Sequence, residues 1–127
     1  MSSFSITSTI KSTPTRLPVA KIKDAILGKR YELSLVYVGT KRAQSLNQAY
    51  RSKSYVPNVL SFPLSDTAGE IFICPKVALK EAKNFDLTPN GYITFLFIHG
   101  CLHLKGHDHG DTMDKLERKY LNAFAIL

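Results

Sequence analysis

The stretch YITFLFIHGCLHLKG, residues 92–106, decides the fold. Its first seven residues are apolar or aromatic apart from Thr94, so a helix formed here is apolar nearly all round and must lie buried. Gly106 supplies a terminator, because glycine readily adopts the left-handed conformation that ends a helix. We therefore predict a central, buried helix that carries His99 and His103 and that the other elements surround.

The segments on either side of this helix predict a mixture of strands and helices. β-Branched and aromatic residues dominate 31–38, and two apolar runs flank the turn-like SDTAG at 65–69, which predicts an antiparallel pair. The expected strands cover 4–10, 31–38, 59–63 and 70–74, and the expected helices cover 18–28, 40–50, 75–84 and 111–125, with a loop at 87–91. This order predicts an α+β fold, a small mixed β-sheet packed by helices.

Length and composition restrict the class of protein. The chain has 127 residues, 44% hydrophobic and 21% charged, as in an ordinary soluble globular protein. No apolar run is long enough to span a membrane, and the N-terminus lacks the apolar core of a signal peptide. Two cysteines fit a reducing compartment. We expect one domain over 1–127, a cytoplasmic monomer. The Ser/Thr-rich N-terminus leaves an organellar matrix as the alternative.

Positive charge is in excess and unevenly distributed. The chain has 17 Lys and Arg against 10 Asp and Glu, a net charge of +7. Residues 1–56 carry +8 and residues 57–127 carry −1. Such an excess bears on partners rather than on fold, and it favours nucleic acid or an anionic membrane surface. The alternative is a solvated basic face without a specific partner.

All four histidines lie in one segment, HGCLHLKGHDH. His99 and His103 are four residues apart, so on a helix they share a face and can reach one metal ion. A turn at Gly106 can bring a third histidine over this pair. His109 completes the spacing HxxxHxxGxxH, whereas a helix that continued past Gly106 would align His107 instead. Three imidazoles leave an open position on zinc, which is typical of a catalytic site.

Metzincin metalloproteases share this ligand spacing. Those enzymes have a glutamate directly after the first histidine as the general base, and here that position is Gly100. A peptidase of this type would lack its proton acceptor. A zincin-like peptidase is therefore the weakest of the functions considered.

Two motifs resemble a known family. HGCLHLKGHDH resembles the HGxLHLxGYDH signature of the YbeY family, metal-dependent endoribonucleases of rRNA maturation, and LNQAYRSKSYVPNVLSFPL at 46–64 resembles its second motif. GEIFIC at 69–74 resembles its Gly-Asp-Ile strand, so the resemblance covers about residues 31–127. It implies an α+β fold, one zinc ion held by His99, His103 and His109, and a functional arginine, Arg51.

The chain departs from the family pattern near the expected substrate. The family's tyrosine is His107 here, and the aspartate usually found three residues after the arginine is Ser54. Val56, Pro57 and Asn58 replace the usual Pro-Thr-Asp or Pro-Thr-Asn. These changes bear on substrate preference and on the level of activity more than on metal binding.

The resemblance implies a single-strand-specific, metal-dependent endoribonuclease that acts in 16S, small-subunit rRNA processing. Metal-activated water would attack an RNA phosphodiester. The guanidinium of Arg51 suits the charge that develops on the phosphoryl oxygens. The candidate proton carriers are Asp108, His107 and Asp111, although Asp108 could instead orient a ligand imidazole.

Two other residues and one other function belong to this prediction. Asn58 and Ser61 could line the cleft, with a strand-end or turn role as the alternative. The alternative function is a ribosome-associated assembly factor whose metal is mainly structural. The expected partner in either case is rRNA of the small ribosomal subunit, with no membrane.

Overall fold

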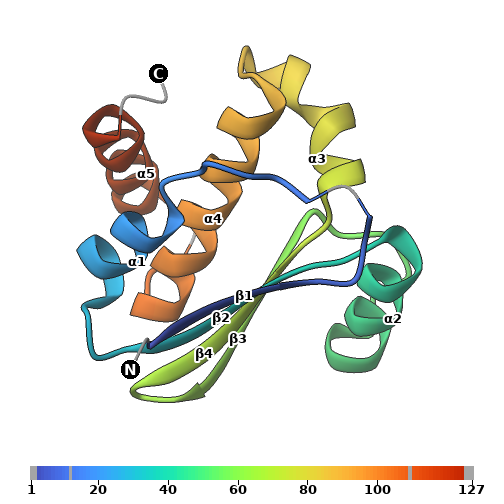
Figure 1. Cartoon of the computed structure of the whole chain (residues 1–127), viewed down its shortest axis with the longest axis horizontal. Coiled ribbons are helices and arrows are strands. Elements are labelled where there is room, and N and C mark those ends of the chain that lie inside the picture. Colours follow the sequence, from blue (N-terminus) through green and yellow to red (C-terminus); the bar gives the residue numbers. More distant parts are fainter. Residues whose placement is uncertain (1–2, 12, 109, 125–127) are drawn as a thin grey trace.

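A computed structural model describes residues 3–11, 13–108 and 110–124. The elements alternate between strands and helices along most of the chain (Figure 1). In order they are β1 (Phe4–Ser8), α1 (Val19–Leu27), β2 (Glu32–Tyr37), α2 (Thr40–Arg51), β3 (Val59–Ser65), β4 (Ala68–Ile73), α3 (Pro75–Glu81), the 3-10 helix η1 (Ala82–Phe85), α4 (Pro89–Lys105) and α5 (Asp111–Ala123).

The four strands form one mixed sheet in the order β1-β2-β4-β3. β1 and β4 lie on either side of β2 and run parallel to it, while β3 pairs antiparallel with β4 at the other edge. In this register Leu35 of β2 lies between Ile6 and Ile71. The expected α+β fold with a small mixed sheet and a 59–74 hairpin is therefore confirmed.

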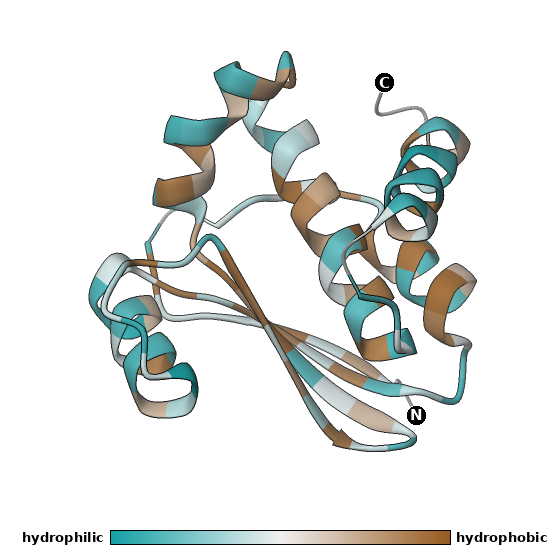
Figure 2. Cartoon of the chain, turned by 180° about the vertical axis from the view of Figure 1, so that it is seen from behind, coloured by the Kyte–Doolittle hydropathy of each residue, from teal (hydrophilic) through white to brown (hydrophobic). Residues whose placement is uncertain are grey.

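Helices cover both faces of the sheet. Leu33, Leu35 and Ile71 belong to a large core that α1, α4 and α5 complete, whereas Leu60 and Phe72 pack in a smaller cluster with residues of α2. Figure 1 shows α2 separated from the other helices by the sheet. Apolar colour runs along α4 between its neighbours (Figure 2).

The two ends of α4 explain one correct boundary and one wrong one. Gly106 ends the helix with a φ of 108°, the left-handed conformation that the sequence predicts. The start differs, because Thr88 caps the helix by accepting a hydrogen bond from the backbone N–H of Gly91 at 3.0 Å. The helix therefore begins at Pro89, inside the segment 87–91 that was expected to be a loop.

Both cysteines are buried and neither forms a disulfide. Cys101 lies on the core side of α4, and burial raises the pKa of its thiol well above the usual range. The thiol is therefore unreactive at neutral pH. In the part of the chain that the structure describes, no helix has both the length and the hydropathy to cross a membrane.

Candidate active site

A cleft lies between α4 and the chain that leaves α2 and enters β3. Its volume is about 660 Å³. The lining residues come from three segments: Arg51 at the end of α2, Tyr55, Pro57, Asn58, Val59, Leu60 and Ser61 from the following loop and β3, and His99 and His103 from α4. The cleft therefore brings Arg51 together with two of the predicted metal ligands.

The two histidines present the same ring atom to each other. The Nε2 atoms of His99 and His103 are 3.0 Å apart, and their rings are nearly perpendicular with centroids separated by 4.5 Å. Two nitrogens that bind one tetrahedral zinc ion, with bonds of about 2.0–2.1 Å, are roughly 3.3 Å apart. The pair thus fits a shared metal with little adjustment.

Glu117 of α5 holds the outer side of His99. Its Oε2 lies 2.7 Å from His99 Nδ1, and both side chains are largely buried. A metal-binding histidine commonly donates its second ring N–H to a carboxylate, which fixes the ring orientation and directs the other nitrogen toward the metal. The arrangement matches that pattern, and it comes from Glu117, while Asp108 is exposed.

The two histidines are the predicted ligands that the described part of the chain contains. His109 lies outside the described residues, and among those residues no third His, Cys, Asp or Glu forms a metal-binding group with the pair. His107 follows the end of α4 and does not continue the helical face of His99 and His103. The helical alignment that would have favoured His107 is therefore absent.

Arg51 is held in the cleft by a buried amide. Its Nη1 donates to Asn47 Oδ1 at 3.3 Å and to the hydroxyl of Tyr55 at 3.2 Å. Asn47 is fully buried, and its Nδ2 donates to the backbone carbonyl of Tyr55 at 3.0 Å. Asn47 therefore joins α2 to the following loop and orients the guanidinium.

Hydrogen bonds fix the part of the cleft wall that Asn58 and Ser61 form. Ser61 Oγ donates to the carbonyl of Gly100 at 3.2 Å, and Asn58 Nδ2 donates to Glu81 Oε1 at 3.0 Å. Tyr92 donates to the same Glu81 oxygen at 3.0 Å. Burial, reinforced by Glu81, raises the pKa of Tyr92 to about 12, so its hydroxyl stays a donor at neutral pH. Asn58 and Ser61 line the cleft, as considered above, and both also hold its wall.

The packing around Gly100 leaves no room for the glutamate that metzincins have at this position. A Cβ on Gly100 would lie 2.9 Å from Ser61 Oγ and 3.0 Å from Ile71 Cδ1. A glutamate side chain here would start toward β3 and β4, on the sheet side of α4. Close packing of α4 on β3 and β4 therefore requires a glycine at this position.

Two residues of the site, Glu117 and Asn47, are missed by the sequence motifs as functional candidates. Glu117 occupies a buried position in line with Met113 and Leu121 on α5, and an acid at such a position was the available signal. Of the other candidates, Asp111 lines a separate pocket with residues of its own helix.

A comparison with models of protein families matches residues 4–125 to the family described as endoribonuclease YbeY. The chain belongs to this family. A Thiobacillus denitrificans endoribonuclease YbeY is 36% identical over 119 residues, which cover 90% of this chain and 80% of the relative. A Spiroplasma citri endoribonuclease YbeY is 37% identical over 113 residues, covering 75% and 72% of the two chains.

The fold has a solved counterpart. The solution structure of a Thermotoga maritima protein matches with a TM-score of 0.66 and 26% identity, over 94% of this chain and 87% of that one. Membership of the YbeY family makes the chain a hydrolytic nuclease with RNA as its substrate.

Proposed function

We propose that the chain is a zinc-dependent endoribonuclease that cuts single-stranded RNA during maturation of small-subunit rRNA, as a cytoplasmic monomer with one domain. The observation that carries the proposal is the convergence of His99 Nε2 and His103 Nε2, 3.0 Å apart, in the cleft that Arg51 also lines. His109 is the proposed third ligand.

The chain's own residues supply positioning and charge. His99 and His103, with His109 as the proposed third ligand, would hold a zinc ion, which would lower the pKa of a water molecule and polarise a phosphoryl oxygen. The guanidinium of Arg51, held by Asn47, can bind the phosphoryl oxygens as their negative charge grows. Ser61 and Asn58 hold the wall against which the backbone would lie. Proton transfer to the leaving oxygen is proposed for Asp108 or His107, whereas Asp111 lies in a separate pocket on α5.

The test combines metal analysis with cleavage. Purified chain and the His99→Ala/His103→Ala variant are compared for bound zinc and for cleavage of single-stranded RNA. We expect the variant to lose both, because two of the three ligands are gone. Equal zinc content would overturn the ligand assignment, and equal cleavage would show that a contaminating nuclease is responsible.

Two further variants decide the third ligand and the alternative function. His109→Ala should lose zinc, while His107→Ala should retain it; the reverse result would assign the site to His107. An assembly factor with a structural metal would bind rRNA yet show no cleavage above that of His103→Ala. Both measurements use the same preparations.

A further inference from the structure

A second pocket lies next to His99, because two of its lining residues, Phe95 and Glu117, contact that histidine. It lies between η1, α4 and α5 and has a volume of about 320 Å³. Phe85, Leu87, Phe95 and Leu121 form its apolar wall, and Asp114, Glu117 and Arg118 form its polar wall. We call this the aromatic subsite.

The apolar wall offers a rigid aromatic surface to solvent. Phe85 is 55% exposed although it is large and apolar. Its ring stacks on Tyr92, with centroids 5.0 Å apart and planes 22° apart, and it is nearly parallel to Phe95 at 6.3 Å. Tyr92 is almost fully buried, so the stack is supported from within the core. An exposed ring held in this way loses little conformational freedom when a flat ligand stacks on it.

The aromatic subsite is continuous with the candidate active site. The rings of Phe95 and His99 have centroids 6.2 Å apart. Glu117 lines the subsite and also contacts His99 at 2.7 Å. A group bound on Phe85 would therefore be separated from His99 by the Phe95 ring. An RNA strand whose backbone occupies the cleft could reach it within a few nucleotides.

The charges of the pocket favour a nucleobase over an anion. Asp114 and Glu117 disfavour a phosphate inside the pocket, whereas carboxylates accept hydrogen bonds from the exocyclic amines of bases. Arg118 is exposed beside them and is suited to a flanking phosphate. Unpaired bases stack on aromatic side chains, which is the common mode of binding single-stranded RNA.

We propose that the aromatic subsite binds one unpaired nucleobase of the RNA substrate, stacked on Phe85, next to the linkage at the histidine pair. This inference rests on the proposed function, since it names where the substrate extends beyond the cleft. It gives the chain a physical reason to prefer single-stranded RNA, because a paired base would have to unpair and unstack before it could bind here, which costs free energy.

The test measures binding of a fluorescent six-nucleotide 2′-O-methyl RNA by anisotropy, with gel electrophoresis to check that the RNA stays intact. Phe85→Ala should raise the dissociation constant roughly ten-fold, the value expected for loss of one stacked base. Phe85→Trp should restore it. Leu79→Ala is the matched control, because Leu79 is equally exposed at 59% but lies on α3 outside the subsite.

A series of RNAs, each lacking one base, identifies the occupant. At one position the loss of the base should weaken binding to the wild-type chain but not to Phe85→Ala. Arg118→Ala should weaken binding more than Lys119→Ala, a neighbouring exposed cation outside the subsite. Equal dissociation constants for Phe85→Ala and Leu79→Ala, with wild-type cleavage intact, would overturn the subsite alone. Absence of RNA cleavage by the wild-type chain would instead overturn the proposed function.

Discussion

Glu117 is a buried acid whose position has a chemical reason. It is 7% exposed on α5 and faces His99 of α4. Burying a carboxylate without a partner is costly, so its contact with Nδ1 compensates for lost hydration. When Nδ1–H donates to this carboxylate, the lone pair of Nε2 points toward His103 and the cleft. A single side chain thus sets the tautomer that metal binding needs.

Glu117→Gln should therefore weaken zinc binding. The amide keeps the shape of the side chain but removes the charge that orients His99, and we expect zinc affinity to fall about 10–100-fold. Competition with a zinc-binding dye measures the affinity without any activity assay. Glu32→Gln, an exposed carboxylate on β2, serves as the control and should keep the wild-type affinity. Equal zinc affinity in both variants would contradict a role for Glu117 at the metal.

At the scale of elements, the end of α2 determines where Arg51 lies. The helix ends at Arg51, and Ser52 follows with a φ of 56°, so the chain turns sharply into the loop. Asn47, one helical turn earlier, holds the guanidinium and the loop carbonyl together. The position of Arg51 therefore depends on the whole C-terminal end of α2, including Asn47 and the turn at Ser52.

A double-mutant cycle tests whether Asn47 acts through Arg51. Arg51→Ala should lower kcat about 100-fold, the usual cost of removing one donor to a developing oxyanion. Asn47→Ala should lower kcat by a smaller factor, and the double variant should be no worse than Arg51→Ala alone, because Asn47 acts through Arg51. Lys76→Ala, an exposed cation of α3 that does not line the cleft, should keep kcat. Multiplicative effects would mean that Asn47 acts independently of Arg51.

Local signals predict elements better than they predict the contacts between them. The end of α4 follows from Gly106, because that conformation is a property of the residue itself. The start is missed because Thr88 and Pro89 suit a loop as well as a cap and a first turn. His99 and His103 are joined by helical spacing, whereas Glu117 reaches His99 across 18 residues through the packing of α5 on α4. No periodicity within either helix reveals that packing.

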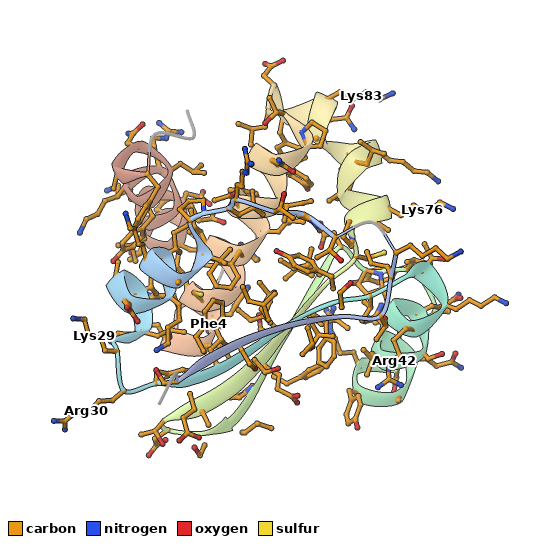
Figure 3. The ribbon with its side chains drawn as sticks, viewed as in Figure 1. Phe4, Lys29, Arg30, Arg42, Lys76 and Lys83 are labelled. Atoms are coloured by element: carbon orange, nitrogen blue, oxygen red, sulfur yellow. The ribbon has the colours of Figure 1, made fainter. Side chains whose placement is uncertain are left out.

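At the scale of the whole molecule, basic residues that lie close together in the sequence lie at opposite ends of the sheet. Figure 3 shows Lys29 and Arg30 projecting at one end of the molecule and Arg42 at the other, beside α2. Lys23 is buried and donates to Ser3 Oγ at 2.9 Å and to the carbonyl of Lys29 at 3.1 Å, so it is not available to RNA. The net charge of +8 in residues 1–56 is therefore not concentrated on one surface.

Among the described basic residues of 1–56, Lys41 and Arg42 lie on α2, the helix whose last residue, Arg51, lines the cleft. Arg42 is nine residues before Arg51, which is about 14 Å along a helix. A single-stranded RNA whose backbone passes Arg51 can reach that distance within a few nucleotides. Lys29 and Arg30 follow α1, at the opposite end of the sheet (Figure 3). Phosphate contacts made near Arg51 can therefore be distinguished from the general electrostatic attraction between a positively charged protein and RNA.

Two charge-reversed variants with equal net charge distinguish these contributions. Lys41→Glu/Arg42→Glu and Lys29→Glu/Arg30→Glu both lower the net charge from +7 to +3 and change only exposed residues. The α2 variant should bind single-stranded RNA more weakly, and its dependence on salt should be flatter by about 1.4 in log–log slope, roughly 0.7 for each lost phosphate contact. The Lys29/Arg30 variant should keep most of the slope, and both should retain zinc, because neither change touches the histidines. Titrations at several salt concentrations measure the slopes. Equal loss in the two variants would show that the net field of the chain, and not the α2 surface, holds the RNA.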